Sequence, residues 1–159
     1  MKTPIPFFVS YAHADQRPAD DFLQRLRGQL APSRRYDYTL WRDTMITVGQ
    51  RWHDEIQQAL ATCTIGLFLV SPAFLTSAYI GQHELPHFLS NAAKSVIPVM
   101  LQPIDFQRHD LRGLEHYQCF MLDRSRAFAD CTTHTLKSRF ASTLFLQIEQ
   151  RLDRLFGQA

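Results

Sequence analysis

The sequence has 159 residues, of which 45% are apolar and 20% are charged. This length and composition exclude a disordered chain and predict one domain over residues 1–159 that folds without a disulfide or a metal. The 17 basic and 15 acidic residues give a net charge of +2, which offers no basis for direct binding of nucleic acid or of a membrane surface. No apolar run reaches the ~18 residues that cross a bilayer, and no signal peptide is visible, so a cytoplasmic location is expected.

The first half of the chain alternates short apolar runs with amphipathic segments. Residues 5–10 are aromatic and β-branched and predict a buried strand, followed by a loop and by a helix whose apolar residues recur up to Leu30. Residues 38–41 predict a second strand. The helical spacing of apolar positions that begins at Trp52 predicts a second helix.

The most apolar run of the chain lies in its centre. Residues 63–70 are apolar on both faces and predict a central strand of a parallel sheet. Ser71 and Pro72 then fit the N-cap and the first position of a helix. Residues 96–101 predict a fourth strand, although Pro98 counts against a central place in the sheet because it donates no hydrogen bond.

The remaining elements complete a regular strand and helix alternation. Residues 117–122 predict a fifth strand, and apolar residues at every fourth position predict a C-terminal helix over about 135–156. The chain is therefore expected to adopt an α/β, flavodoxin-like three-layer sandwich with a five-stranded parallel sheet in the order 2-1-3-4-5. Ligands of such sheets bind beyond the carboxyl ends of strands 1 and 3, a rule that selects residues 10–15 and the segment starting at Ser71.

Both segments belong to motifs that occur in a familiar order. Residues 8–15 read FVSYAHAD, and residues 69–80 read LVSPAFLTSAYI. The other motifs are Trp41-Arg42-Asp43, then Ile46, Gly49, Trp52 and Ile56, later Glu84-Leu85-Pro86, and finally Ile97-Pro98-Val99. Together they resemble the strands and loops of bacterial Toll/interleukin receptor (TIR) domains over roughly residues 5–122, and the final helix is consistent with that family.

The resemblance implies two possible activities. Many TIR domains cleave NAD⁺ at the nicotinamide–ribose bond, whereas others are scaffolds that bind only TIR partners. In the catalytic members the required carboxylate follows the third strand, a position that Glu84 matches. NAD⁺ would then be a substrate, and no cofactor or metal is expected. The resemblance also implies self-association through TIR–TIR contacts, activity on assembly, and a role in antiphage defence under a sensor that the sequence does not identify.

Glu84 can perform this chemistry only if it reaches the strand ends. Loss of nicotinamide builds positive charge on the ribose, which a carboxylate stabilises. In one straight helix from residue 72 to 92, Glu84 would lie about 18 Å from the strand end. We therefore expect a break between Ser77 and Glu84, with Pro86 in the first turn of a new helix whose dipole favours the anion.

The supporting residues have two interpretations each. Ser10 can donate a hydrogen bond to ribose or phosphate, or cap the end of its strand. Tyr11 and Tyr79 can stack on a base or fill the core. Asp43 can bind a ribose or shape a turn. Trp52 is expected in the core.

A literal zinc-protease pattern competes for the same carboxylate. Residues 83–87 read HELPH, in which His83 and His87 would bind zinc on one helix face and Glu84 would act as the base. Pro86 disfavours the unbroken helical turn that this arrangement needs. A zinc hydrolase is therefore the third hypothesis, after the NAD⁺-cleaving enzyme and the non-enzymatic interaction module.

Overall fold

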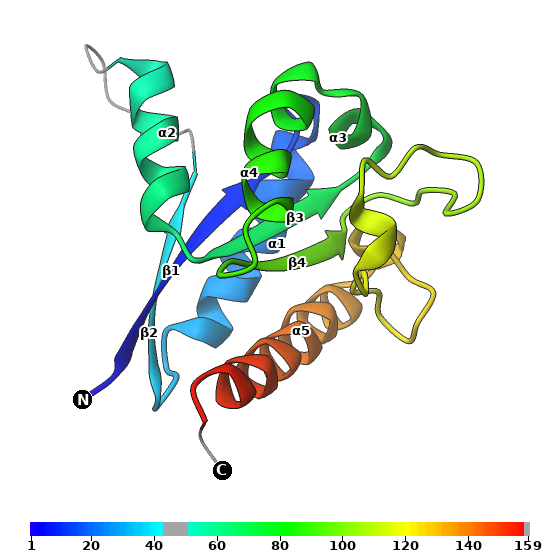
Figure 1. The fold of residues 1–159 in the computed structure, drawn as a ribbon. Coiled ribbons are helices and arrows are strands. Elements are labelled where there is room, and N and C mark those ends of the chain that lie inside the picture. The colour runs from blue at the N-terminus through cyan, green and yellow to red at the C-terminus, as the bar shows by residue number, and fades with distance from the viewer. Residues whose placement is uncertain (43–50, 158–159) are drawn as a thin grey trace.

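In the computed structural model, which describes residues 1–42 and 51–157, four parallel strands form a sheet in the order β2-β1-β3-β4 (Figure 1). The strands are β1 (Thr3–Ser10), β2 (Tyr36–Trp41), β3 (Ile65–Val70) and β4 (Ser95–Met100). The helical elements are η1 (His13–Asp15), α1 (Gln16–Leu30), α2 (Trp52–Thr62), α3 (Pro72–Thr76), the π-helical turn η3 (Ile80–Glu84), α4 (Leu85–Leu89), η4 (Leu114–His116), η5 (Phe128–Asp130) and α5 (His134–Leu155). Within this part of the chain, no helix is long and apolar enough to cross a membrane.

Helices cover both faces of the sheet, as the α/β prediction requires. On one face the apolar side chains of α1 and α5 pack against β1 and β3, and on the other face those of α2 and α4 do so (Figure 1). Every residue of β3 is buried, which confirms the central strand. Close packing on the second face depends on Gly66, because a Cβ there would lie 3.0 Å from Cδ1 of Phe88 on α4.

The fifth strand predicted at residues 117–122 is wrong. Within the described residues, only Phe120 of this segment pairs with β4. Its N–H donates to the carbonyl of Pro98 at 2.8 Å, and its carbonyl accepts from the N–H of Met100 at 3.0 Å. The sheet therefore ends at β4 and has the order 2-1-3-4.

Backbone chemistry explains why this pairing stops after one residue. The N–H and C=O of a strand residue point to the same edge, and Pro98 directs its carbonyl at Phe120. The next donor along that edge would be the N–H that proline lacks. At the other end, the N–H of Leu122 donates to the carbonyl of Arg126 at 2.9 Å instead of to β4. Pro98 thus lies on an edge strand, where its missing N–H is tolerated.

Partly buried hydrogen bonds join β2 to the C-terminal half of α5. The hydroxyl of Tyr36 donates to Asp153 at 2.6 Å, and the hydroxyl of Tyr38 donates to Glu149 at 2.6 Å. Burial and the neighbouring Asp153 carboxylate raise the pKa of Tyr36 to about 12. Burial and Glu149 raise the pKa of Tyr38 as well. Both phenols are therefore held in their neutral, donating form.

We expect these two tyrosines to make stability depend on alkaline pH. An unfolded tyrosine ionises near pH ~10, whereas Tyr36 in the folded protein ionises near a pKa of about 12. Their contribution is therefore complete below pH ~10 and is lost as pH rises through the folded pKa values. Urea denaturation at a series of pH values measures this loss. A Tyr36→Phe/Tyr38→Phe variant should be less stable at neutral pH and less sensitive to alkali, and an equally steep decline would contradict the assignment.

The packing between α1 and α5 predicts a large effect of Phe140→Ala. Phe140 is fully buried, and its ring lies 5.8 Å from Phe22, 4.9 Å from Phe120 and 5.5 Å from Phe128 between centroids. Its truncation should lower the free energy of unfolding by about 3–5 kcal/mol in urea denaturation. Leu146→Ala, at a position of the same helix that is 55% exposed, is the matched control and should change it by less than about 0.5 kcal/mol.

Candidate active site at the carboxyl ends of the strands

A buried serine and a buried glutamate meet where β1 ends. Ser10 is the last residue of β1, and its hydroxyl donates a hydrogen bond of 2.6 Å to Oε1 of Glu84. Ser10 is 2% exposed and Glu84 is 8% exposed. The two residues are separated by 74 positions, so the fold brings the carboxylate to the strand end at which ligands of such sheets bind.

A break in the helix after β3 makes this contact possible. Helix α3 ends at Thr76, and Ser77 adopts an extended conformation with φ −69° and ψ 118°. Helical backbone resumes at residue 78 in a new direction and continues through η3 into α4 (Figure 1). The expected break between Ser77 and Glu84 is therefore confirmed at its first residue.

The segment that carries Glu84 is a π-helical turn. The N–H of Leu85 reaches back five residues to the carbonyl of Ile80. Pro86 follows in the first turn of α4, as expected. Proline has no N–H and its ring collides with the carbonyl four residues earlier, so a wider turn before it relieves the collision. The backbone is already helical before Glu84, so the carboxylate does not lie at a free helix N-terminus. The prediction that a helix dipole favours the anionic form of Glu84 is therefore wrong.

A second pair of serine and carboxylate lies at the end of β3, and the sequence analysis missed it. The hydroxyl of Ser71 donates to Asp15 of η1 and accepts the N–H of Phe74 at 3.0 Å. The predicted N-cap at Ser71 is thus confirmed. Asp15 occupies the N-cap position of α1 but makes no side-chain capping bond there. Ser10 ends β1 and Ser71 follows β3, and each serine donates a hydrogen bond to a buried carboxylate. A serine at the end of each strand was the feature of the sequence that could have indicated the second pair.

Four ring-bearing residues form an aromatic cluster beside Glu84: Trp52, His53, Tyr79 and His83. The ring centroid of Tyr79 lies 4.7 Å from that of Trp52 and 4.7 Å from that of His83, and its hydroxyl lies 3.3 Å from Nδ1 of His53. Burial and the nearby Glu84 carboxylate raise the pKa of Tyr79. The core position expected for Trp52 is wrong. Trp52 is the first residue of α2, and its side chain is 47% exposed.

The other two candidate binding residues differ in their surroundings. Tyr11 is buried with the apolar residues beneath β1, and its hydroxyl accepts a hydrogen bond of 3.4 Å from Arg42. Arg42 is also paired with Asp20 of α1. Asp43 lies outside the described residues. The substrate-binding roles of Tyr11, Asp43, Ser10 and Tyr79 remain predictions.

The histidines of the zinc pattern have separate surroundings. His83 is exposed and belongs to the aromatic cluster, whereas Nε2 of His87 is buried and has no hydrogen-bond partner among residues 1–42 and 51–157. Among the residues placed by the structure, no three His, Cys, Asp or Glu side chains form a group that could hold a metal ion. The zinc hypothesis thus lacks a grouped third ligand in that part of the chain.

The sheet is parallel, and a hydrogen-bonded carboxylate lies at the carboxyl ends of its central strands. These two features are typical of α/β domains that bind a ligand at this edge of the sheet. The family model of the TIR domain matches residues 7–135, so the chain belongs to the TIR domain family. A search among curated proteins finds no match. The membership supports the resemblance at the level of the domain.

The Ser71 and Asp15 pair predicts a loss of stability for Ser71→Ala. The substitution removes the N-cap of α3 and leaves a buried carboxylate without its hydroxyl donor, which should cost about 1–3 kcal/mol in urea denaturation. Thr76→Ala, on the exposed side of the same helix, should cost less than about 0.5 kcal/mol. In a double-mutant cycle with Asp15→Ala, strictly additive effects would contradict an interaction between the two side chains.

Proposed function

We propose that the domain is an NAD⁺ nucleosidase in which Glu84 is the catalytic residue. The observation that carries the proposal is the hydrogen bond from Ser10 to Glu84, because it holds a carboxylate at the ligand-binding edge of the sheet. A helix-surface glutamate would have no reason to be 8% exposed and bound to a strand end. Membership in the TIR family supports the substrate class, since many members cleave NAD⁺.

The chemistry requires a negative charge more than a proton donor. Nicotinamide is cationic in NAD⁺ and leaves as a neutral molecule when the C–N bond electrons pass to its ring nitrogen. Positive charge then develops on the ribose, and a carboxylate stabilises it best in a site sheltered from water. A water molecule adds its oxygen to the sugar carbon and releases a proton, which gives ADP-ribose, nicotinamide and H⁺.

The residues around Glu84 have distinct parts in this proposal. The hydroxyl of Ser10 fixes one carboxylate oxygen, so the side chain does not have to be ordered again when substrate arrives. Tyr79 and Trp52 of the aromatic cluster present ring faces on which a base of NAD⁺ can stack. Ser10 and Tyr11 remain candidates for ribose and phosphate contacts. Asp43 stays a candidate for the ribose.

Assembly is part of the proposed mechanism. Self-association is a general property of TIR domains. In the catalytic members, a neighbouring subunit completes the NAD⁺-cleaving site. We therefore propose that the isolated domain is nearly inactive and that clustering by a sensor switches it on. A role as a cytoplasmic effector of antiphage defence follows from the same family comparison.

The test is nicotinamide release from NAD⁺ by protein clustered on vesicles through a terminal affinity tag. Clustered wild type should release nicotinamide, and Glu84→Gln should lower the rate at least about 100-fold, because the amide keeps the shape but not the charge. Circular dichroism and urea denaturation establish that the variant is folded. Chromatography of the second product separates ADP-ribose from a cyclised isomer.

Glu115→Gln is the matched control, since Glu115 is an exposed glutamate in the short helix η4 and should keep the wild-type rate. Glu84→Gln with full activity would remove Glu84 from the chemistry. Absence of release from clustered, folded wild type would favour the non-enzymatic interaction module. Peptide hydrolysis that a chelator abolishes would instead favour the zinc hydrolase.

A further inference from the structure

The proposed activity leaves one part of the substrate without a partner. NAD⁺ carries a negatively charged diphosphate between its two riboses. The residues assigned to the substrate so far are hydroxyls, rings and carboxylates, and they include no arginine or lysine. A site that contains the Glu84 carboxylate repels the diphosphate unless a cation lies close to it. We therefore searched the carboxyl ends of the strands for that cation.

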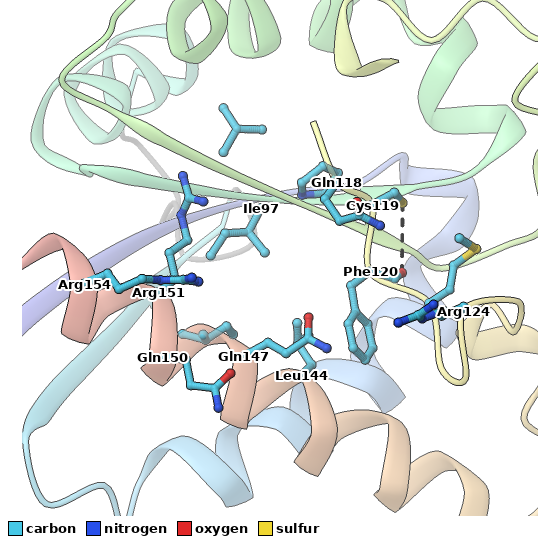
Figure 2. A pocket seen from close by; sticks show the side chains of 14 residues that line it. Ile97, Gln118, Cys119, Phe120, Arg124, Leu144, Gln147, Gln150, Arg151 and Arg154 are labelled. Atoms are coloured by element: carbon cyan, nitrogen blue, oxygen red, sulfur yellow. Dashed lines mark hydrogen bonds between the residues drawn. The ribbon is translucent and has the colours of Figure 1, made fainter. Parts of the chain in front are cut away.

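Three arginines of the protein lie in a groove that is separate from these strand ends. The groove has a volume of about 670 Å³ between β4 and α5, and it is lined by Arg124, Arg151 and Arg154 (Figure 2). None of its lining residues belongs to β1 or to the segment 71–84 that ends at Glu84. These arginines therefore cannot be assigned to the substrate of the Glu84 site.

The guanidinium of Arg112 lies against the helical segment that carries Glu84. Arg112 belongs to the loop after β4, and loops of this kind leave a parallel sheet at its ligand-binding edge. A Cβ on Gly81 would lie 3.2 Å from Cζ of Arg112 and 3.6 Å from Nη2, so the guanidinium occupies the space of the missing side chain. Gly81 precedes Glu84 by three residues, and helical residues three apart are neighbours on the helix surface. The cation thus lies about one helical turn from Glu84.

The turn that carries Arg112 is fixed by its neighbours. Leu111 and Leu114 are 8% and 6% exposed and belong to the apolar cluster that contains Leu85 of α4. Arg112 has a φ of 57°, in the left-handed region, and its N–H donates to Oδ1 of Asp110 at 3.0 Å. A residue other than glycine keeps such a conformation only where the surrounding structure imposes it. The backbone therefore holds the start of this side chain in a defined place.

The guanidinium of Arg112 is available to a ligand. Among residues 1–42 and 51–157, it forms no ion pair and no hydrogen bond, and the side chain is exposed. Arg42, which follows β2, is paired with Asp20. Arg108 lies 4.0 Å from Asp105 in the same loop as Arg112. A guanidinium donates hydrogen bonds in a planar fork that matches the oxygens of a phosphate. Arg112 can therefore bind a phosphate without giving up an ion pair.

The helical segment orders the groups around it in the same way as they occur in NAD⁺. Tyr79 belongs to the aromatic cluster, and Gly81 faces Arg112. Residues two apart point to nearly opposite sides of a helix, and Glu84 projects between these two sides. A ligand that passes along the segment would meet rings, then a carboxylate, then a guanidinium. The nicotinamide ring, its ribose and the diphosphate follow one another in that order.

We propose that Arg112 binds the diphosphate of NAD⁺, an inference that rests on the proposed function of Glu84. The diphosphate keeps its charge while nicotinamide leaves, so this contact is equally strong before and during bond cleavage. An interaction of this kind lowers KM and does not raise kcat. Arg112 is thus a residue for substrate binding, whereas Glu84 acts on the bond that breaks.

Steady-state kinetics of the clustered protein test this division of roles. Arg112→Ala should raise KM for NAD⁺ at least about tenfold and change kcat less than about threefold. Arg112→Lys should restore part of the affinity, because it keeps the charge but not the fork. Arg108→Ala removes an arginine of the same loop whose side chain is 88% exposed, and it is the matched control with wild-type KM. A fall in kcat at unchanged KM would show that Arg112 supports the Glu84 segment, and the proposal would be wrong.

Gly81→Ala tests the contact without changing any charge. The added methyl group would displace the guanidinium of Arg112. It should raise KM at least about fivefold in the wild type and change it little in the Arg112→Ala background, because the two residues act as a pair. Equal effects in both backgrounds would mean that the methyl group acts on the helix alone, and would contradict the assigned contact.

Binding of ADP separates this inference from the proposed activity, since it needs no turnover. In ¹H–¹⁵N spectra of the domain, ADP should shift the Nε–Hε signal of Arg112, and adenosine should not. Arg112→Ala should weaken ADP binding at least about fivefold. No shift with ADP, or binding that survives Arg112→Ala but is lost in Arg17→Ala of α1, would overturn the proposal. If clustered wild type releases no nicotinamide while ADP binding still depends on Arg112, the proposed activity fails and the diphosphate site stands.

Discussion

The hydrogen bond between Ser10 and Glu84 is the constraint on which the site depends. Burying a carboxylate is costly unless a donor satisfies it, and a hydroxyl at 2.6 Å from Oε1 does so at the end of a rigid strand. The contact fixes the path of the chain after β3, because Glu84 reaches Ser10 only if α3 stops at Thr76 and the helix restarts at another angle. The π-helical turn before Pro86 carries Glu84 and is part of the same change in the path of the helix. A local backbone irregularity thus places a charge that a regular helix would leave in water.

The fold was largely predictable from the sequence because burial patterns are local. The apolar run that became β3 and the four-residue periodicity of α5 each identify their element without knowledge of the rest of the chain. The fifth strand failed because strand formation is not local. Residues 117–122 have a suitable apolar pattern, but pairing needs donors on the neighbouring strand, and Pro98 lacks one. The doubt raised by Pro98 was therefore sound, and the error was to treat the edge beyond it as covered.

The candidate site was predictable only in part, for a related reason. Glu84 was identified through its motif and through a distance argument about the helix that carries it, both of which a sequence provides. The bond between Ser71 and Asp15 joins two loops, and no pattern states which of several polar side chains will meet when parallel strands end together. The exposure of Trp52 was missed because its helical spacing fits a core face, whereas its position at the first turn of α2 leaves the ring beyond the sheet.

The strand ends and the loop after β4 illustrate opposite ways of using charge in one small domain. At the strand ends, each buried carboxylate is matched by a serine, so the charge is held in place before any ligand arrives. In the loop after β4, Arg112 is exposed and forms no ion pair in the described part of the chain, and the diphosphate that it is proposed to bind keeps its charge throughout the reaction. A prepositioned, desolvated charge suits a reaction in which charge develops at one atom.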